Sequence, residues 1–142
     1  MTFITARPIL PAAFLLATPP ASCSALATFF GVVRNHHAGR TVRRLHYECY
    51  ASMANCEIRR IKEEVVIRRE LADIRILHRI GTLEIGEIAV AVAASSAHRA
   101  EALAACAEVV EEIKRSVPIW KKEFYEDGTS AWVGCAHAEA VS

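Results

Sequence analysis

The stretch VPIWKKE, residues 117–123, joins the end of a predicted helix to the start of a predicted strand. Pro118 ends the helix, Lys114 lies shortly before it, and Lys121 and Lys122 open the strand. Lysines gathered at such a junction are placed to hold an anion or to act as polar catalysts. A cation near a helix C-terminus also complements the helix dipole, which alone would explain Lys114. Because neighbouring strand residues point to opposite faces, we expect at most one of the two strand lysines in any one pocket.

Apolar residues at helical spacing predict two long helices. The later helix, at about residues 97–117, carries a stripe formed by Leu103, Cys106, Val110, Ile113 and Val117. Ser95 and Ser96 precede it as candidate N-caps. The earlier helix, at residues 51–71, carries a stripe formed by Ala54, Ile58, Ile61 and Val65.

Strands are predicted between and around these helices. Residues 2–8 are β-prone, a short helical turn is expected at 12–17, and a polar loop at 34–40. The predicted strands are residues 25–33, 42–50, 73–79, 87–94, 120–125 and 131–135. Two helices over a mainly antiparallel sheet predict an α+β two-layer sandwich, and we expect residues 1–142 to form one domain.

Composition narrows the class of protein. A chain of 142 residues with 53% hydrophobic and 23% charged residues is expected to fold, and its net charge of +1 gives no global attraction to nucleic acid or anionic membranes. Five cysteines without CxxC spacing argue against a disulfide framework or a structural zinc site. The apolar run Ile9–Pro20 imitates a secretory signal, but its basic start is reduced to Arg7, and no run is long enough to span a bilayer.

Two further clusters carry basic residues. Arg34 follows a predicted buried strand, where its planar fork could clamp a phosphate, although a solvated loop is the simpler interpretation. The neighbouring His36 and His37 have no matching ligand set, so we expect no metal site. His98 and Arg99 fall in the first turn of the later helix, where they oppose the dipole unless an anion binds or both side chains extend into water.

In these residues the chain resembles the large, catalytic subunit of molybdopterin synthase. The matching stretches occur in family order over about residues 2–135 and include Asp127-Gly128 and Trp132-Val133. The others are FGVVRNH (30–36), LHYECY (45–50) with Met53, HRIG (78–81), SSAHRAEA (95–102), and PIWKKE (118–123) with Lys114.

The resemblance implies a hammerhead-like sandwich and a specific reaction. Members of the family convert cyclic pyranopterin monophosphate (precursor Z) into the dithiolene-bearing molybdopterin. Sulfur arrives as a thiocarboxylate on the C-terminal glycine of a small ubiquitin-like partner, whose tail enters a pocket of the large subunit. The implied assembly is a cytoplasmic heterotetramer around a dimer of large subunits, and no metal or other cofactor is expected.

The resemblance also implies residue roles. Lys114 and Lys121 match the two catalytic lysines. Arg34, His98 and Arg99 match substrate-binding positions, and His98 and Arg99 are expected to serve the other subunit's site across the dimer. Further substrate-pocket positions are matched by Val32, Val33, Lys122 and Glu123.

Two other classes of protein remain open on the sequence. One is a non-catalytic α+β module that binds a phosphorylated ligand or RNA, but RNA binding would call for more stacking aromatics than 7% of the chain. The other is a phosphate-ester hydrolase that uses His98 and Arg99, which lacks an evident nucleophile or metal set.

Overall fold

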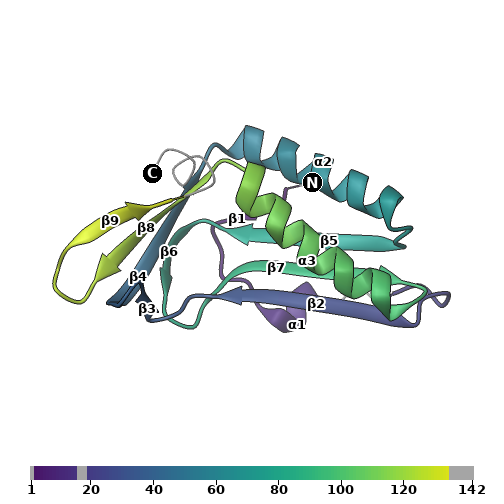
Figure 1. Cartoon of the computed structure of the whole chain (residues 1–142), viewed down its shortest axis with the longest axis horizontal. Coiled ribbons are helices and arrows are strands. Elements are labelled where there is room, and N and C mark those ends of the chain that lie inside the picture. Colours follow the sequence, from purple (N-terminus) through teal and green to yellow (C-terminus); the bar gives the residue numbers. More distant parts are fainter. Residues whose placement is uncertain (1, 16–18, 135–142) are drawn as a thin grey trace.

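The computed structural model describes residues 2–15 and 19–134. It contains two sheets that lie next to each other, the second at one end of the first (Figure 1). The first sheet has the strand order β1-β5-β7-β2, in which β5 and β2 pair antiparallel with β7, and β1 pairs parallel with β5. Its strands are β1 (Ile4–Thr5), β2 (Ala25–Val32), β5 (Asp73–Arg79) and β7 (Ile88–Ser96).

The second sheet is antiparallel throughout and has the order β3-β4-β8-β9, with β6 also paired to β4. Its strands are β3 (His36–His37), β4 (Arg40–Cys49), β6 (Gly81–Glu84), β8 (Ile119–Tyr125) and β9 (Ser130–Val133). Figure 1 shows this sheet at one end of the first sheet. The α+β class and the mainly antiparallel sheet are confirmed.

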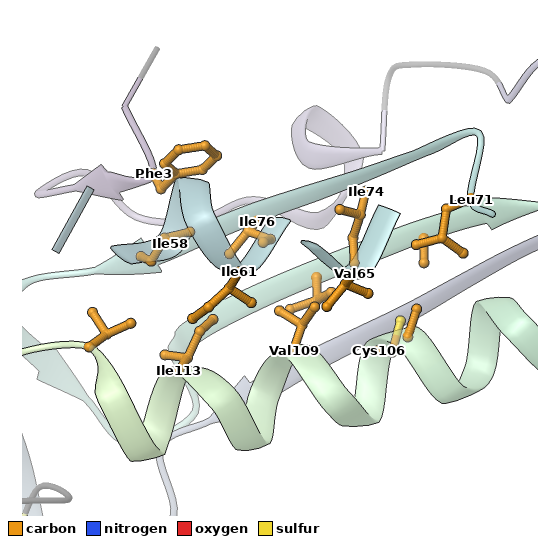
Figure 2. Close-up of a cluster of buried hydrophobic side chains, with 14 of the residues drawn as sticks. Phe3, Ile58, Ile61, Val65, Leu71, Ile74, Ile76, Cys106, Val109 and Ile113 are labelled. Carbon is orange, nitrogen blue, oxygen red and sulfur yellow. The ribbon is translucent and has the colours of Figure 1, made fainter. Parts of the chain in front are cut away.

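Helices α2 (Ala51–Arg68) and α3 (Arg99–Ser116) cover one face of the first sheet (Figure 1). Figure 2 shows their facing side chains, among them Ile61 and Val65 from α2 and Val109 and Ile113 from α3. Strand β7 closes this core with Val92 and Ala94, while the alternate residues point to the opposite face. The core therefore lies between the helix pair and the first sheet.

The stripe predicted for α3 is confirmed at Cys106, Ile113 and Val117, which are buried, and Val110 packs half-buried against the core, but the stripe is wrong at Leu103. Leu103 is 61% exposed. Ala102, Ala105 and Val109 are fully buried instead, beside the buried Cys106 and Ile113. Small alanines at the contact let the helix backbone approach the strands closely. A pattern of large apolar residues does not identify these alanines as part of the buried face. The stripe predicted for α2 is confirmed at all four positions.

The start of α3 also differs from the prediction. Ser95 and Ser96 continue β7 and pair with Leu26 and Ala25 of β2, so neither caps the helix. His98 occupies the N-cap position in an extended conformation without a side-chain capping hydrogen bond. Pairing across the sheet thus overrides the local preference of serine for helix starts.

The apolar N-terminal run covers the other face of the first sheet. Ile9 and Phe14 pack against Ala91 and Ala93 of β7, and Phe14 contacts the ring of Phe30 edge-on. The predicted helical turn is α1 (Pro11–Phe14), and its expected end falls on residues outside the described part. In the part of the chain that the structure describes, no helix is long and apolar enough to cross a membrane.

Replacing Ile61 by Ala should lower the free energy of unfolding by about 3 kcal/mol, because the side chain is 1% exposed at the centre of the core. The matched control is Ile67→Ala on the same helix, where the side chain is 78% exposed and the expected change is under about 0.5 kcal/mol. Urea unfolding followed by circular dichroism measures both. Equal losses for the two variants would contradict the core placed between α2 and the sheet.

Candidate active site

A cavity of about 470 Å³ opens where the two sheets meet at the C-terminal half of α3. Its walls are largely apolar and come from β2, β4, β7, α3 and β8. Six side chains with polar atoms or charges also line it: Arg34, Tyr47, His78, Lys114, Lys121 and Glu123. A concave, mostly apolar site with a few convergent polar groups is the usual form of a small-molecule site.

Both lysines expected to be catalytic line this cavity. Lys114 lies in the last turn of α3 and is exposed, whereas Lys121 lies near the start of β8 and is half-buried. Only Val117 and Pro118 separate the helix from the strand, and both are buried. This short connection brings residues from a helix and a strand to one wall.

Lys122 lies on the opposite face of β8. Its ammonium stands over the rings of Phe124, at 5.4 Å, and Trp132, at 5.6 Å, and it does not line the cavity. The alternation of strand side chains separates it from Lys121, as expected for neighbouring residues. Its part in substrate binding stays a prediction without support from this geometry.

Arg34, Val32 and Val33 all line the cavity at the end of β2. Neighbouring residues of a regular strand would face opposite ways, but the register with β7 shifts between Gly31 and Val32. A Cβ added at Gly31 would lie 2.7 Å from Cγ1 of Val90, so a larger residue there would force the strands or the valine to shift. This register shift directly precedes the three consecutive residues that line the cavity.

Glu123 is a buried carboxylate in this cavity, with only 3% of its surface exposed. Its Oε1 accepts hydrogen bonds from Nδ1 of His37 and from the hydroxyl of Tyr125, each at 3.0 Å. Burial, together with the hydrogen bond and negative charge of Glu123, raises the pKa of the Tyr125 phenol. Tyr125 therefore remains a neutral hydrogen-bond donor to the carboxylate.

Sequence reasoning gave no role to Tyr47 and His78, although both fall in the matching stretches. Their rings meet edge-on with centroids 5.2 Å apart. Burial, with a smaller effect of the Glu123 charge, raises the pKa of Tyr47 to about 12. Burial also lowers the pKa of His78 to about 4, and its Nδ1 lies 2.8 Å from the carbonyl oxygen of Arg79. That oxygen can only accept, so Nδ1 carries the proton of a neutral imidazole.

The N-terminal end of α3 is far from the cavity. His98 and Arg99 are both exposed there, and neither lines the cavity. The axial rise of a helix places them about 24 Å along the axis from Lys114. Their expected service to a second subunit's site stays a prediction.

No group of three or more His, Cys, Asp or Glu side chains within residues 2–15 and 19–134 is arranged to hold a metal ion. The two adjacent histidines have separate partners. His36 lies 3.1 Å from the side chain of Asn35, and His37 contacts Glu123. Four described cysteines, Cys23, Cys49, Cys56 and Cys106, are free thiols.

These features define an α+β protein with a basic, apolar-walled cavity suited to an anionic small molecule. The model of one family, described as MoaE protein, matches residues 4–116, and the chain belongs to that family. Relatives of the chain carry the name molybdopterin synthase catalytic subunit. The Oryza sativa relative is 46% identical over 107 residues, which cover 75% of this chain and 55% of the relative. The Bacillus subtilis relative is 42% identical over 92% of this chain and 83% of the relative.

Solved structures show the same fold. The molybdopterin synthase structure from Staphylococcus aureus superposes with a TM-score of 0.87 at 38% identity, over 94% of this chain and 96% of that one. A Helicobacter pylori structure, described as a complex of subunits 1 and 2 of molybdopterin-converting factor, is 18% identical with a TM-score of 0.66 and supports the fold alone. Its match covers 79% of this chain and 73% of that one. The chain spans about half the length of its rice and rat relatives, 55% in each case.

Lowering the pH should destabilise the protein through His78. Its pKa is about 4 in the folded chain and about 6.5 in the unfolded chain, so the unfolded state binds the proton first. Stability from this residue is complete above pH 6.5 and falls by up to about 3 kcal/mol toward pH 4. Urea unfolding across this range should show a shallower decline for His78→Gln. An equal slope in His78→Gln and the wild type would refute the assignment.

Proposed function

We propose that this chain is the catalytic subunit of a molybdopterin synthase. As a sulfurtransferase, it would move sulfur from the C-terminal thiocarboxylate of a small ubiquitin-like partner to cyclic pyranopterin monophosphate, forming the dithiolene of molybdopterin. The observation that carries this proposal is the convergence of Arg34, Lys114 and Lys121 on one apolar-walled cavity in a member of the MoaE family.

The charges of the cavity suit the proposed substrates. The pterin carries a phosphate, which the planar fork of Arg34 binds well, and the partner's thiocarboxylate is a second anion. Lys121 or Lys114 would stabilise the thiocarboxylate and the oxyanion that forms as its sulfur attacks the pterin side chain. Water would then cleave the resulting thioester at its acyl carbon, which leaves the sulfur on the pterin and releases the partner with a C-terminal carboxylate. One of the two lysines would also transfer a proton. Val32, Val33 and Glu123 shape the walls around the pterin.

The product needs two sulfurs, whereas each partner chain delivers one. The half-sulfurated intermediate would therefore stay bound while a spent partner leaves and a loaded one enters. An open cavity with exposed Lys114 and Arg34 at its rim is compatible with this exchange. Lys122, on the outer face of β8, would contribute only through its packing on Phe124 and Trp132.

The position of His98 and Arg99 supports a dimer of large subunits within a heterotetramer. Both side chains are exposed about 24 Å from Lys114 along α3, so they would serve the cavity of a second copy. There they would supply two more positive groups for the substrate phosphate. Free thiols in the described chain agree with a cytoplasmic location.

Replacing Lys114 by Ala should reduce dithiolene formation at least about 100-fold, because a positive group at the reacting oxyanion is lost. The assay mixes the chain with a thiocarboxylated partner and precursor Z and measures the dithiolene product. Arg115→Ala is the matched control, since this neighbouring exposed cation pairs with Glu112 outside the cavity. Normal turnover by Lys114→Ala would refute the catalytic role of Lys114. Failure of the wild type to bind a ubiquitin-like partner would favour a non-catalytic phosphate-binding module.

Mixing two inactive variants tests the shared site. Lys114→Ala and Arg99→Ala should each be inactive alone, but a mixed dimer would contain one intact cavity. Random reassociation should restore roughly a quarter of wild-type activity, because about half of the dimers are mixed and each has one working site. The restored rate is measured after subunit exchange at equal concentrations. No recovery, with mixed dimers demonstrated by mass spectrometry, would show that Arg99 acts within its own chain.

A further inference from the structure

The negative charge of Glu123 is unexpected in a cavity that is suited to anions. The cavity gathers three cationic side chains and is suited to anions, yet one wall carries this carboxylate. Only 3% of Glu123 is exposed, so water screens its charge weakly. Its field reaches other cavity residues, because it contributes to the raised pKa of Tyr47. A phosphate in the cavity would meet this repulsion unless the charge is offset nearby.

Among the described residues, Tyr125 and His37 each contribute a hydrogen bond to the Glu123 carboxylate. The Tyr125 hydroxyl donates to Oε1 but remains neutral. Arg40 stacks over the Tyr125 ring at 3.6 Å, but its guanidinium is bonded to Asp127 and Thr129. Of the two hydrogen-bond donors, only His37 can carry a positive charge.

A tight hairpin positions His37 for this contact. β3 pairs with β4 at His37 and Arg40, and the two residues between them, Ala38 and Gly39, have φ angles of 51° and 78°. Positive φ at both central residues matches the two-residue turn that best fits the twist of a hairpin. The His37 side chain is 36% exposed and the Glu123 side chain 4%, so the imidazole links a buried carboxylate to solvent.

We propose that His37 is a positioning residue of the cavity, which fixes the Glu123 carboxylate and, in its protonated form, offsets its charge so that an anionic substrate can bind. A buried carboxylate that loses its partner repels a second anion strongly, because removing one member of a buried pair leaves an uncompensated charge. The other charged or titratable groups that share the site are Lys121 and Tyr125 on β8, Tyr47 on β4, His78 on β5, Lys114 on α3 and Arg34 after β2. The identity of the substrate rests on the proposed function, whereas the charge effect does not.

The test compares the wild type with His37→Leu, which removes donor and charge, and His37→Gln, which keeps a neutral donor. His36→Leu is the matched control, because the adjacent ring contacts Asn35 and not Glu123. Isothermal titration calorimetry with inorganic pyrophosphate reports anion affinity, and steady-state assays with the loaded partner report KM for precursor Z and kcat. Circular dichroism verifies that each variant is folded.

We expect His37→Leu to weaken pyrophosphate binding about tenfold and to raise KM by a similar factor, with kcat changed less than about twofold. His37→Gln should lie between it and the wild type, and His36→Leu should match the wild type. Adding Glu123→Gln to His37→Leu should restore pyrophosphate affinity to within about threefold of the wild type, because a neutral amide needs no counter-charge.

Unchanged pyrophosphate affinity in His37→Leu, or no restoration by Glu123→Gln, would overturn the inference. If His37→Leu fails to fold, His37→Gln decides alone: weaker pyrophosphate binding supports the role of charge, and equal binding overturns it. A wild type that forms no dithiolene but shows the expected series of pyrophosphate affinities would refute the proposed function and leave the role of His37 standing.

Discussion

The close packing of α3 on the first sheet is the constraint on which the site depends. Ala102, Ala105 and Val109 are fully buried at this contact, and their small size sets the distance between helix and strands. Only two buried residues then connect α3 to β8, and β8 is held in turn by its pairing with β4. Lys114 on the helix and Lys121 on the strand therefore come to one wall without any flexible loop. Groups carried by rigid elements keep the geometry that electrostatic stabilisation requires.

The cavity also depends on the balance between its positive side chains and the buried carboxylate of Glu123. Positive groups from α3, β8 and the end of β2 surround an apolar space, and Glu123 is buried beside them. Tyr47 and His78 are held neutral by burial, so they add polar atoms without adding charge at physiological pH. The net charge that an incoming anion meets is thus set by few residues, and the proposed role of His37 would act on this charge through Glu123.

Elements with strong local periodicity were predictable, and features that depend on tertiary pairing were not. The buried stripe of α2 repeats every three or four residues and was identified fully, whereas the buried face of α3 was identified only in part, because alanines make up some of it. Ser95 and Ser96 have the local chemistry of helix caps, but pairing with β2 keeps them in a strand. The resemblance placed Lys114, Lys121 and Arg34 in one site, which spacing alone could not do. The roles of Tyr47, His78 and His37 depend on burial and on contacts between distant strands, and no single-sequence pattern encodes these.

The two ends of α3 are in different electrostatic situations. At the C-terminal end Lys114 complements the helix dipole, so the site gains a cation at no local cost. At the N-terminal end His98 and Arg99 oppose the dipole, and His98 caps the helix without a side-chain hydrogen bond. Glu101 in the first turn partly offsets this unfavourable positive charge. Its carboxylate also pairs with Arg69, the C-cap residue of α2. An anion bound at this end would remove the remaining conflict, and among the described residues His98 and Arg99 do not line the cavity next to Lys114. The proposed dimer would supply such an anion, because a substrate in the cavity of a second copy would lie against this helix end.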